Sequence, residues 1–212
     1  MDALWQAWLE YYKTEIYDDI DKPYRSEVCF EPVDEADIAE CEQMTKLKIP
    51  EDLKTIYQYT SKGFGLFFGE TLYSPKQMIE YHQQWVGLGY IDTPDNDQVD
   101  NPAYPPNTVR PVYINQYWLP FAGEVDNRNY WAIDYDPLAD GKVGQIINAG
   151  RESNWELRFS FQGDITAFAR IIMQRIEAGK TAINAEGKLL ICKASIQSNH
   201  CITELLKKGE FR

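Results

Sequence analysis

The stretch 118–151 constrains the fold of this chain more than any other part of the sequence. Within it, 130–134 and 143–148 have the composition of β-strands, and a six-residue connection that ends in Asp-Gly joins them. Trp131 and Ile133 share one face of the first strand, because side chains alternate along a strand. The stretch is therefore predicted to form a β-hairpin.

Several short motifs of the chain resemble the core signature of the SUKH superfamily, which includes fungal cell-wall-synthesis regulators and bacterial immunity proteins. In order they read Trp118-Leu119-Pro120-Phe121, Ala132-Ile133-Asp134-Tyr135-Asp136-Pro137 and Gly144-Gln145-Ile146-Ile147-Asn148, and Ile49-Pro50-Glu51-Asp52-Leu53 matches further upstream. Lys62-Gly63 stands where the family has Asn-Gly, which leaves any role of that Asn side chain in doubt. The resemblance implies structural roles for Pro50, Gly63, Trp118, Pro120, Asp134, Asp136, Pro137, Gly141, Gly144 and Gln145.

The resemblance implies an α+β fold: a single domain with a mostly antiparallel central sheet and helices packed against it. It covers residues 1–180 and is strongest at 118–151, and we expect 181–212 to be a strand and helix appendage packed on the same domain. An unrelated α+β domain with a similar hairpin is the alternative.

The rest of the chain predicts further elements. Helices are expected before Pro23, from Asp34 to Lys46, from Pro50 to a stop at Gly63, from the Ser74 capping box, at 164–178 and near 202–208. Strands are expected on either side of a turn within 64–73, at 109–117, at 155–161 as a half-buried strand, and at 189–192.

Composition excludes several classes of protein. The net charge is 21 − 33 = −12, which disfavours direct binding to nucleic acid or to anionic membranes but suits a basic protein partner. High solubility alone also explains such a charge. No apolar run is long enough to cross a membrane, and the N-terminus has no secretory pattern, so a cytoplasmic location is expected. The four cysteines fit no zinc motif and are expected to be thiols.

No catalytic site, metal site or cofactor is predicted. Asp134, Asp136 and Asp140 miss the calcium-loop pattern, because Leu138 and Gln145 stand where ligands are needed, so turn capping is the interpretation. His82 is expected to be packed in the fold. An enzyme with a carboxylate site is an alternative that the sequence leaves open.

Charge and aromatic residues indicate a partner surface. The segment 92–106 contains several aspartates and is interrupted by prolines, and aromatic side chains flank it. The connection at 123–129, before the second signature motif, is also acidic. The residues concerned are Asp92, Asp95, Asp97, Asp100, Glu124, Asp126, Trp85, Tyr90 and Tyr104. A merely solvated loop is the alternative interpretation of the segment.

The leading functional hypothesis is a protein resembling the immunity proteins, which would bind and neutralise a basic toxin domain such as a nuclease. A regulatory scaffold of the fungal type is the alternative. The sequence names neither the partner nor the oligomeric state.

Overall fold

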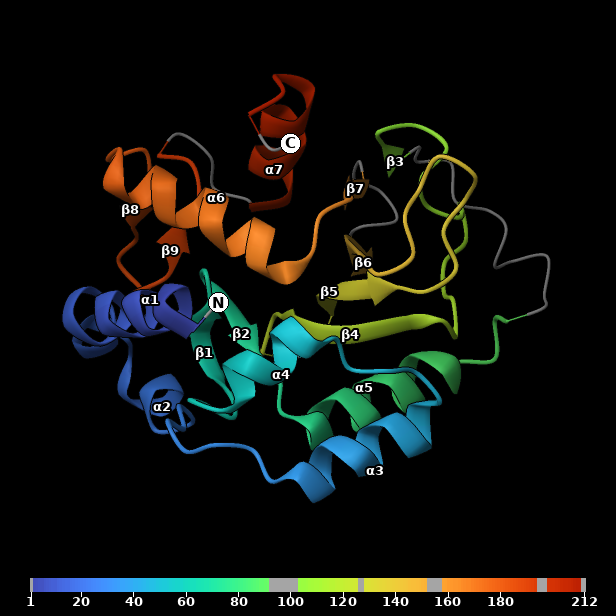
Figure 1. Cartoon of the computed structure of the whole chain (residues 1–212), viewed down its shortest axis with the longest axis horizontal. Helices are drawn as coiled ribbons and strands as arrows, with labels where there is room; N and C mark the ends of the chain where they lie inside the picture. The colour runs from blue at the N-terminus through green and yellow to red at the C-terminus, as the bar shows by residue number, and fades with distance from the viewer. Residues whose placement is uncertain (1, 92–102, 126–127, 152–157, 194–197, 211–212) are drawn as a thin grey trace.

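A computed structural model gives the structure of the chain (Figure 1) and describes residues 2–91, 103–125, 128–151, 158–193 and 198–210. Its centre is a seven-stranded sheet in the order β1-β2-β4-β5-β6-β7-β3. The strands are β1 Gly63–Phe67, β2 Glu70–Leu72, β3 Ala103–Tyr104, β4 Trp118–Gly123, β5 Asn129–Asp134, β6 Gln145–Gly150 and β7 Arg158–Phe161. All neighbouring pairs are antiparallel except β3 and β7. The predicted α+β fold with a mostly antiparallel sheet is confirmed.

Helices cover both faces of this sheet (Figure 1): α6 and α7 lie on one side, α3 and α5 lie on the other, and α1 lies near β1. They are α1 Asp2–Glu15, η1 Tyr17–Asp19, α2 Lys22–Arg25, α3 Glu35–Thr45, α4 Glu51–Tyr57, α5 Pro75–Val86, α6 Ile165–Glu177 and α7 Ser198–Lys207. A small hairpin of β8 Ala182–Ile183 and β9 Leu189–Leu190 follows α6.

The predicted helix starts are present with their caps. Asp34 accepts a hydrogen bond from Ala36 N before α3, and Ser74 and Gln77 form the full capping box of α5. At α6 the cap is Asp164, which accepts from Ala167 N. These caps depend on neighbouring residues alone, so the sequence predicts them well.

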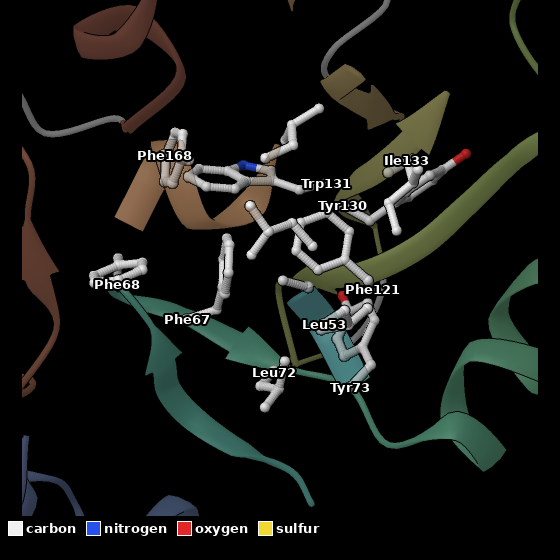
Figure 2. Close-up of a cluster of buried hydrophobic side chains, with 14 of the residues drawn as sticks. Leu53, Phe67, Phe68, Leu72, Tyr73, Phe121, Tyr130, Trp131, Ile133 and Phe168 are labelled. Atoms are coloured by element: carbon white, nitrogen blue, oxygen red, sulfur yellow. The ribbon is translucent and has the colours of Figure 1, made fainter. Parts of the chain in front are cut away.

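An aromatic cluster joins α6 to the sheet (Figure 2). The Phe168 ring meets the Trp131 ring edge-on with centroids 5.3 Å apart, and Phe67 stacks on Phe168 at 5.9 Å. All three side chains are at most 2% exposed, and so is Ile133, which lies on the same face of β5 as Trp131. Such rings contribute large buried areas and a preferred geometry. The hairpin is thus the centre of the core.

The first edge of the sheet is closed by side chains of α1. Trp8 donates its indole N–H to Leu66 O at 2.7 Å, and the Tyr12 hydroxyl donates to Phe64 O at 2.5 Å. An open edge strand would present these carbonyls to other chains. The aromatic stripe of the first helix therefore buries apolar surface and also occupies acceptors of the edge strand.

Several sequence predictions were wrong because tertiary contacts replace local pairing. The segment 109–117 forms no strand, since nearby backbone carbonyls accept hydrogen bonds from side chains of Gln145, Arg158 and His82. That segment covers the second face of the sheet, so β7 is buried on both faces and not half-buried: Arg158 is 1% exposed and Ser160 is 0% exposed.

The bounds of some helices and strands also differ from those predicted. Gly63 does not stop a helix: α4 ends at Tyr57, and Gly63 begins β1, where a Cβ would lie 2.8 Å from Val28 Cα. The second hairpin strand begins at Gln145, so Val143 is outside it and 64% exposed. Tyr104, expected in a loop, lies in a short strand.

The C-terminal segment packs on the same sheet. The backbone of Leu189 approaches Gly69 so closely that a Cβ there would lie 2.2 Å from Leu189 O, and Lys188 pairs with Glu70 at 3.1 Å. Ile202 of α7 is fully buried. The division into a domain 1–180 and an appendage 181–212 stays a prediction.

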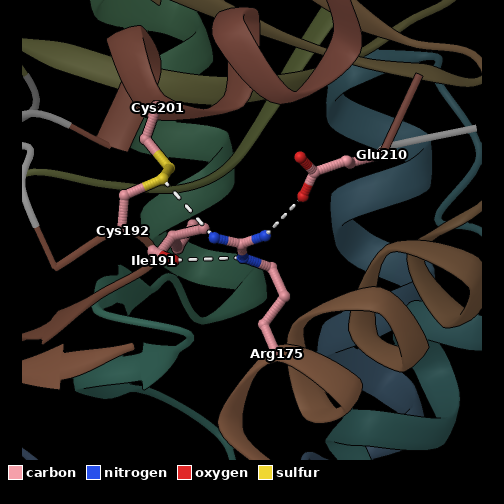
Figure 3. Close-up of a disulfide and its surroundings, with 5 residues drawn as sticks. All are labelled: Arg175, Ile191, Cys192, Cys201 and Glu210. Atoms are coloured by element: carbon pink, nitrogen blue, oxygen red, sulfur yellow. Dashed lines mark hydrogen bonds and ion pairs between the residues drawn. A yellow bond between two sulfur atoms is a disulfide. The ribbon is translucent and has the colours of Figure 1, made fainter. Parts of the chain in front are cut away.

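The expectation of four thiols was wrong for Cys192 and Cys201, which form a disulfide (Figure 3). The fold of the C-terminal segment brings their Cα atoms to 5.9 Å, which the spacing in the sequence does not reveal. Cys29 and Cys41 are free, and burial raises the pKa of Cys41 to about 12, so its thiol is unreactive.

Arg175 of α6 ties the segments around this disulfide together (Figure 3). It donates to Ile191 O at 3.2 Å and pairs with Glu210 at 3.3 Å, and it also contacts Cys192 Sγ at 3.7 Å. The guanidinium therefore bridges the end of β9 and the residues that follow α7.

The central hairpin gives a test of the fold. Ile133→Ala should lower the free energy of unfolding by about 2–5 kcal/mol, because it leaves a cavity in a fully packed core. Val143→Ala is the matched control and should change it by less than about 0.5 kcal/mol, because Val143 is exposed. Urea denaturation measures both, and coincident midpoints for Ile133→Ala and wild type would contradict the burial of this face.

Candidate protein-binding groove

An open groove with an apolar floor lies beside β2. Two adjoining pockets of about 290 and 560 Å³ form it, and both are lined by Tyr24, Phe64, Thr71 and Val125. Tyr24 is 40% exposed and stacks on Phe64 with ring centroids 5.0 Å apart, and Val125 is 47% exposed. Exposed apolar side chains that gather in a concave site are typical of binding surfaces.

Each part of the floor comes from a different element. Tyr24 lies on α2, a single turn in which Pro23 occupies the start of the helix, and Phe64 comes from β1. Val125 follows β4, and its carbonyl accepts from Tyr81 of α5 at 3.5 Å. The groove therefore exists only where these elements meet.

The turn that carries Val125 is closely packed against the sheet. Gly123 has φ of +153°, and a Cβ there would lie 2.6 Å from Tyr130 Cα, so only glycine fits. The carbonyl of Glu124 accepts from the Tyr73 hydroxyl at 2.7 Å, and its carboxylate accepts from Asn129 at 3.0 Å. The acidic side chain of Glu124 thus also has a local role in the turn.

Charged side chains form the walls of the groove, and carboxylates outnumber cations. The acidic residues are Asp21, Glu27, Glu70, Glu124 and Glu186, and the basic ones are Lys62, Arg128 and Lys188. Lys62 pairs with Glu27 at 3.3 Å, and Lys188 pairs with Glu70 at 3.1 Å. The charged lining of the two pockets is therefore acidic overall, with five carboxylates and three cations.

The structure brings only some of the predicted partner residues together. Trp85 is 9% exposed and packs on Tyr130 at 5.2 Å, while Tyr90 is 38% exposed and packs on Tyr113 at 5.3 Å. Trp85 also meets Tyr113 at 6.1 Å. These rings form a cluster at the C-terminal end of α5, in which Tyr90 is the exposed member.

The other predicted partner residues lie elsewhere. Glu124 lies in the groove, next to Val125, whose carbonyl accepts from Tyr81 near the middle of α5. Tyr104 is in β3, three strands from Tyr130 and thus about 14 Å away across the sheet. Asp92, Asp95, Asp97, Asp100 and Asp126 lie outside the described residues.

Three of the signature residues, Trp118, Asp134 and Gln145, take part in a buried polar network and not in an open site. The Asp134 carboxylate is fully buried and accepts from Trp118 Nε1 at 3.1 Å and from Gln145 Nε2 at 2.8 Å. Gln145 also donates to Thr108 O at 2.9 Å and accepts from Ser160 Oγ at 2.7 Å. Burial raises the pKa of Asp134, and these hydrogen bonds oppose the shift.

Within the described part of the chain, only Asp134 of the three aspartates expected to cap the turn accepts from a backbone N–H of the turn, while Asp136 and Asp140 bind side chains of the segment 107–115. The backbone N–H of Asp136 donates to Asp134 Oδ1 at 2.9 Å, and Asn107 donates to Asp140 at 2.8 Å. Arg110 binds the Asp136 carboxylate through two nitrogens, at 2.5 and 2.9 Å. Burial would raise the pKa of Asp136, but the bonds from Arg110 and from Asn115 outweigh it and lower the pKa.

The described residues contain no cluster of three or more His, Cys, Asp or Glu side chains placed to hold a metal. His82 is packed in the fold, as expected: it is 8% exposed, its Nε2 lies 2.8 Å from Gln116 O, and burial lowers its pKa. Of the helices in the described parts of the chain, none is long and apolar enough to span a bilayer.

Sequence reasoning missed Tyr24, Phe64 and Val125 as a common surface. The only local signal is Tyr24 itself, an aromatic residue that follows Pro23 in an otherwise polar stretch. The acidic residues around it are, by themselves, typical of a solvated loop.

The sequence of this chain is similar to that of known proteins. A family model described as the SMI1 / KNR4 family (SUKH-1) matches residues 32–163. The "Cell wall assembly regulator SMI1" of Saccharomyces cerevisiae is 25% identical over 183 residues, which cover 65% of this chain and 36% of the yeast protein. The "KNR4/SMI1 homolog" of Kluyveromyces lactis is 33% identical over 104 residues, which cover 44% of this chain and 18% of the relative. The chain thus matches less than two fifths of the length of either curated relative.

The buried network gives a second test. Gln145→Leu should lower the free energy of unfolding by about 3 kcal/mol, because it removes one donor from the buried Asp134 carboxylate and leaves the Ser160 hydroxyl and the Lys142 N–H without their acceptor. The control Gln83→Leu, on the exposed side of α5, should change it by less than about 0.5 kcal/mol. Chemical denaturation measures both.

The pH dependence of the stability that Gln145→Leu loses provides an independent readout. Removal of the Gln145 donor should raise the folded-state pKa of Asp134 further above its unfolded value. The charged form then opposes folding, so the deficit relative to wild type should be smaller at about pH 5 than at about pH 8. An equal deficit at both pH values would show that Asp134 does not depend on Gln145.

Proposed function

Because the chain belongs to the SMI1 / KNR4 family (SUKH-1), we propose that it is a non-catalytic domain that regulates other proteins by binding them directly. One relative is named a cell wall assembly regulator, which supports a regulatory role. The relatives are longer than the region that this chain matches. What the whole relatives do is therefore carried over to this chain only as a proposal.

The observation that carries this proposal is the groove. Its floor exposes Tyr24 and Val125, whose apolar surface gains from burial against a partner. Side chains from several elements line it, so its shape is set by the packed domain. A preformed concave surface loses little conformational entropy on binding.

The charge of the chain supports a basic partner. The net charge is −12, and carboxylates exceed cations in the groove walls. The aspartates at 92, 95, 97 and 100 add to the negative charge of the chain. We include these four residues and Asp126 in the proposed interface. A negative field accelerates association with a positively charged protein.

Neutralisation of a toxin is a second candidate, and the acidic charge is the observation that favours it. A toxin domain that acts on nucleic acid needs a basic surface to bind phosphates, and an acidic protein complements such a surface. Under this candidate the domain binds over or beside the active site of the toxin.

A cytoplasmic location is also part of the proposal. Disulfides are rare in cytosolic proteins, so the bond between Cys192 and Cys201 is a feature that this location does not favour. Fractionation of the native cell, with thiol labelling of the protein, addresses both points.

The proposed function predicts specific capture of a basic protein from native cell extract. Proteins retained on the immobilised chain at low salt should be purified and tested one at a time for stoichiometric binding by calorimetry. The true partner should associate more slowly as salt rises, by about tenfold or more, because screening weakens the attraction. Toxin neutralisation further requires that co-expression of the chain abolishes the toxicity of that partner.

Two results would contradict the proposal. One is the absence of any captured protein that binds when purified. The other is turnover of the captured protein or its ligand by the chain, which would make the chain an enzyme.

A further inference from the structure

We infer that the groove binds an extended basic segment of the partner, with one aromatic or long aliphatic side chain in the smaller pocket and Lys or Arg side chains against the carboxylates of the larger one. This inference rests on the proposed protein-binding function and specifies the site and the chemistry of its ligand.

The smaller pocket has the size and lining of an anchor site. Its volume of about 290 Å³ is at the lower end for ligand sites, which suits a single large side chain. The stacked rings of Tyr24 and Phe64 and the exposed Val125 supply apolar contact, and Thr71 and Gln77 supply polar atoms at the margin. Aromatic anchors in such pockets contribute most of the affinity of many interfaces.

The larger pocket favours positive charge. Four acidic residues line it, Asp21, Glu70, Glu124 and Glu186, against two basic ones, Arg128 and Lys188. Asp21 and Glu186 are exposed, so they are placed to meet a ligand from solvent. The exposed ring of Tyr24 also accepts a cation over its face.

The ligand is held through side chains and not by addition of a strand to β1. In β1, the carbonyls of Phe64 and Leu66 already accept from Tyr12 and Trp8 of α1. The neighbouring strand β2 lies between β1 and β4. Recognition therefore depends on the pockets, where an extended segment places alternate side chains.

Only part of the groove lies within the residues that the family model matches. Phe64, Thr71 and Val125 lie within the residues that the family model matches. Tyr24, at the start of the chain, and Glu186, near its end, lie outside them. The matched region thus supplies Phe64 and Val125 of the floor, while the flanking segments supply Tyr24 of the floor and Glu186 of the wall.

Selection from a phage-displayed library of random peptides tests this inference before any partner has been identified. Peptides enriched on the wild-type chain should carry Lys or Arg next to an aromatic or long aliphatic residue. A labelled synthetic peptide of the enriched sequence, measured by fluorescence anisotropy, should bind about tenfold or more weakly to Tyr24→Ala and to Val125→Arg. The double variant with Asp21→Asn and Glu186→Gln should bind more weakly at low salt and lose much of its salt dependence.

Tyr117→Ala is the matched control, because Tyr117 is 47% exposed and precedes β4 at the end opposite Gly123. It should bind the peptide as wild type does. Thermal unfolding of each variant shows whether the fold is intact, and Val125→Arg, at an exposed turn position, keeps the test valid if Tyr24→Ala is unstable.

Enrichment of acidic peptides, no enrichment at all, or equal binding by the two groove variants and wild type would overturn the inference. If the purified partner binds wild type and both groove variants equally, the proposed function stands and the groove is not its site. If no partner binds wild type, the proposed function fails as well.

Discussion

The buried carboxylate of Asp134 is the constraint on which much of this structure depends. A buried carboxylate that water does not solvate needs hydrogen-bond donors from the protein. Here Trp118, Gln145 and the backbone N–H of Asp136 supply them. These donors come from β4, from β6 and from the connection between β5 and β6. The network therefore fixes the register of three neighbouring strands. It also draws Thr108 against the sheet, because the Gln145 amide donates to its carbonyl.

Burial of the sheet on both faces follows from this arrangement. Arg158 is 1% exposed and lies with its guanidinium 4.9 Å from the ring centroid of Trp118, where burial lowers its pKa to about 10. The same face of β7 carries Ser160, which joins the network through Gln145. Irregular backbone between β3 and β4 completes this side, and its Arg110 carbonyl accepts a hydrogen bond from Arg158 Nη1.

The proposed function rests on the surface that this packing leaves exposed. The apolar stripe of α1 is used inside the molecule and at the edge of β1, so its tryptophans are not a partner surface. Two exposed apolar side chains, Tyr24 and Val125, instead lie together where α2, the start of β1 and the turn after β4 meet. Acidic side chains from both ends of the chain surround them, and the proposed basic ligand complements both properties.

The sequence by itself determined the features that depend on neighbouring residues. These include the hairpin around Ile133, the helix caps at Ser74 and Asp164, and the family signature with the turn cap at Asp134. Only the tertiary structure decided the features that depend on distant segments. Arg158 looked solvent-facing because strand alternation cannot reveal that residues 109–117 cover it. The disulfide and the groove were hidden for the same physical reason: Cys192 meets Cys201, and Tyr24 meets Val125, only after the chain has folded.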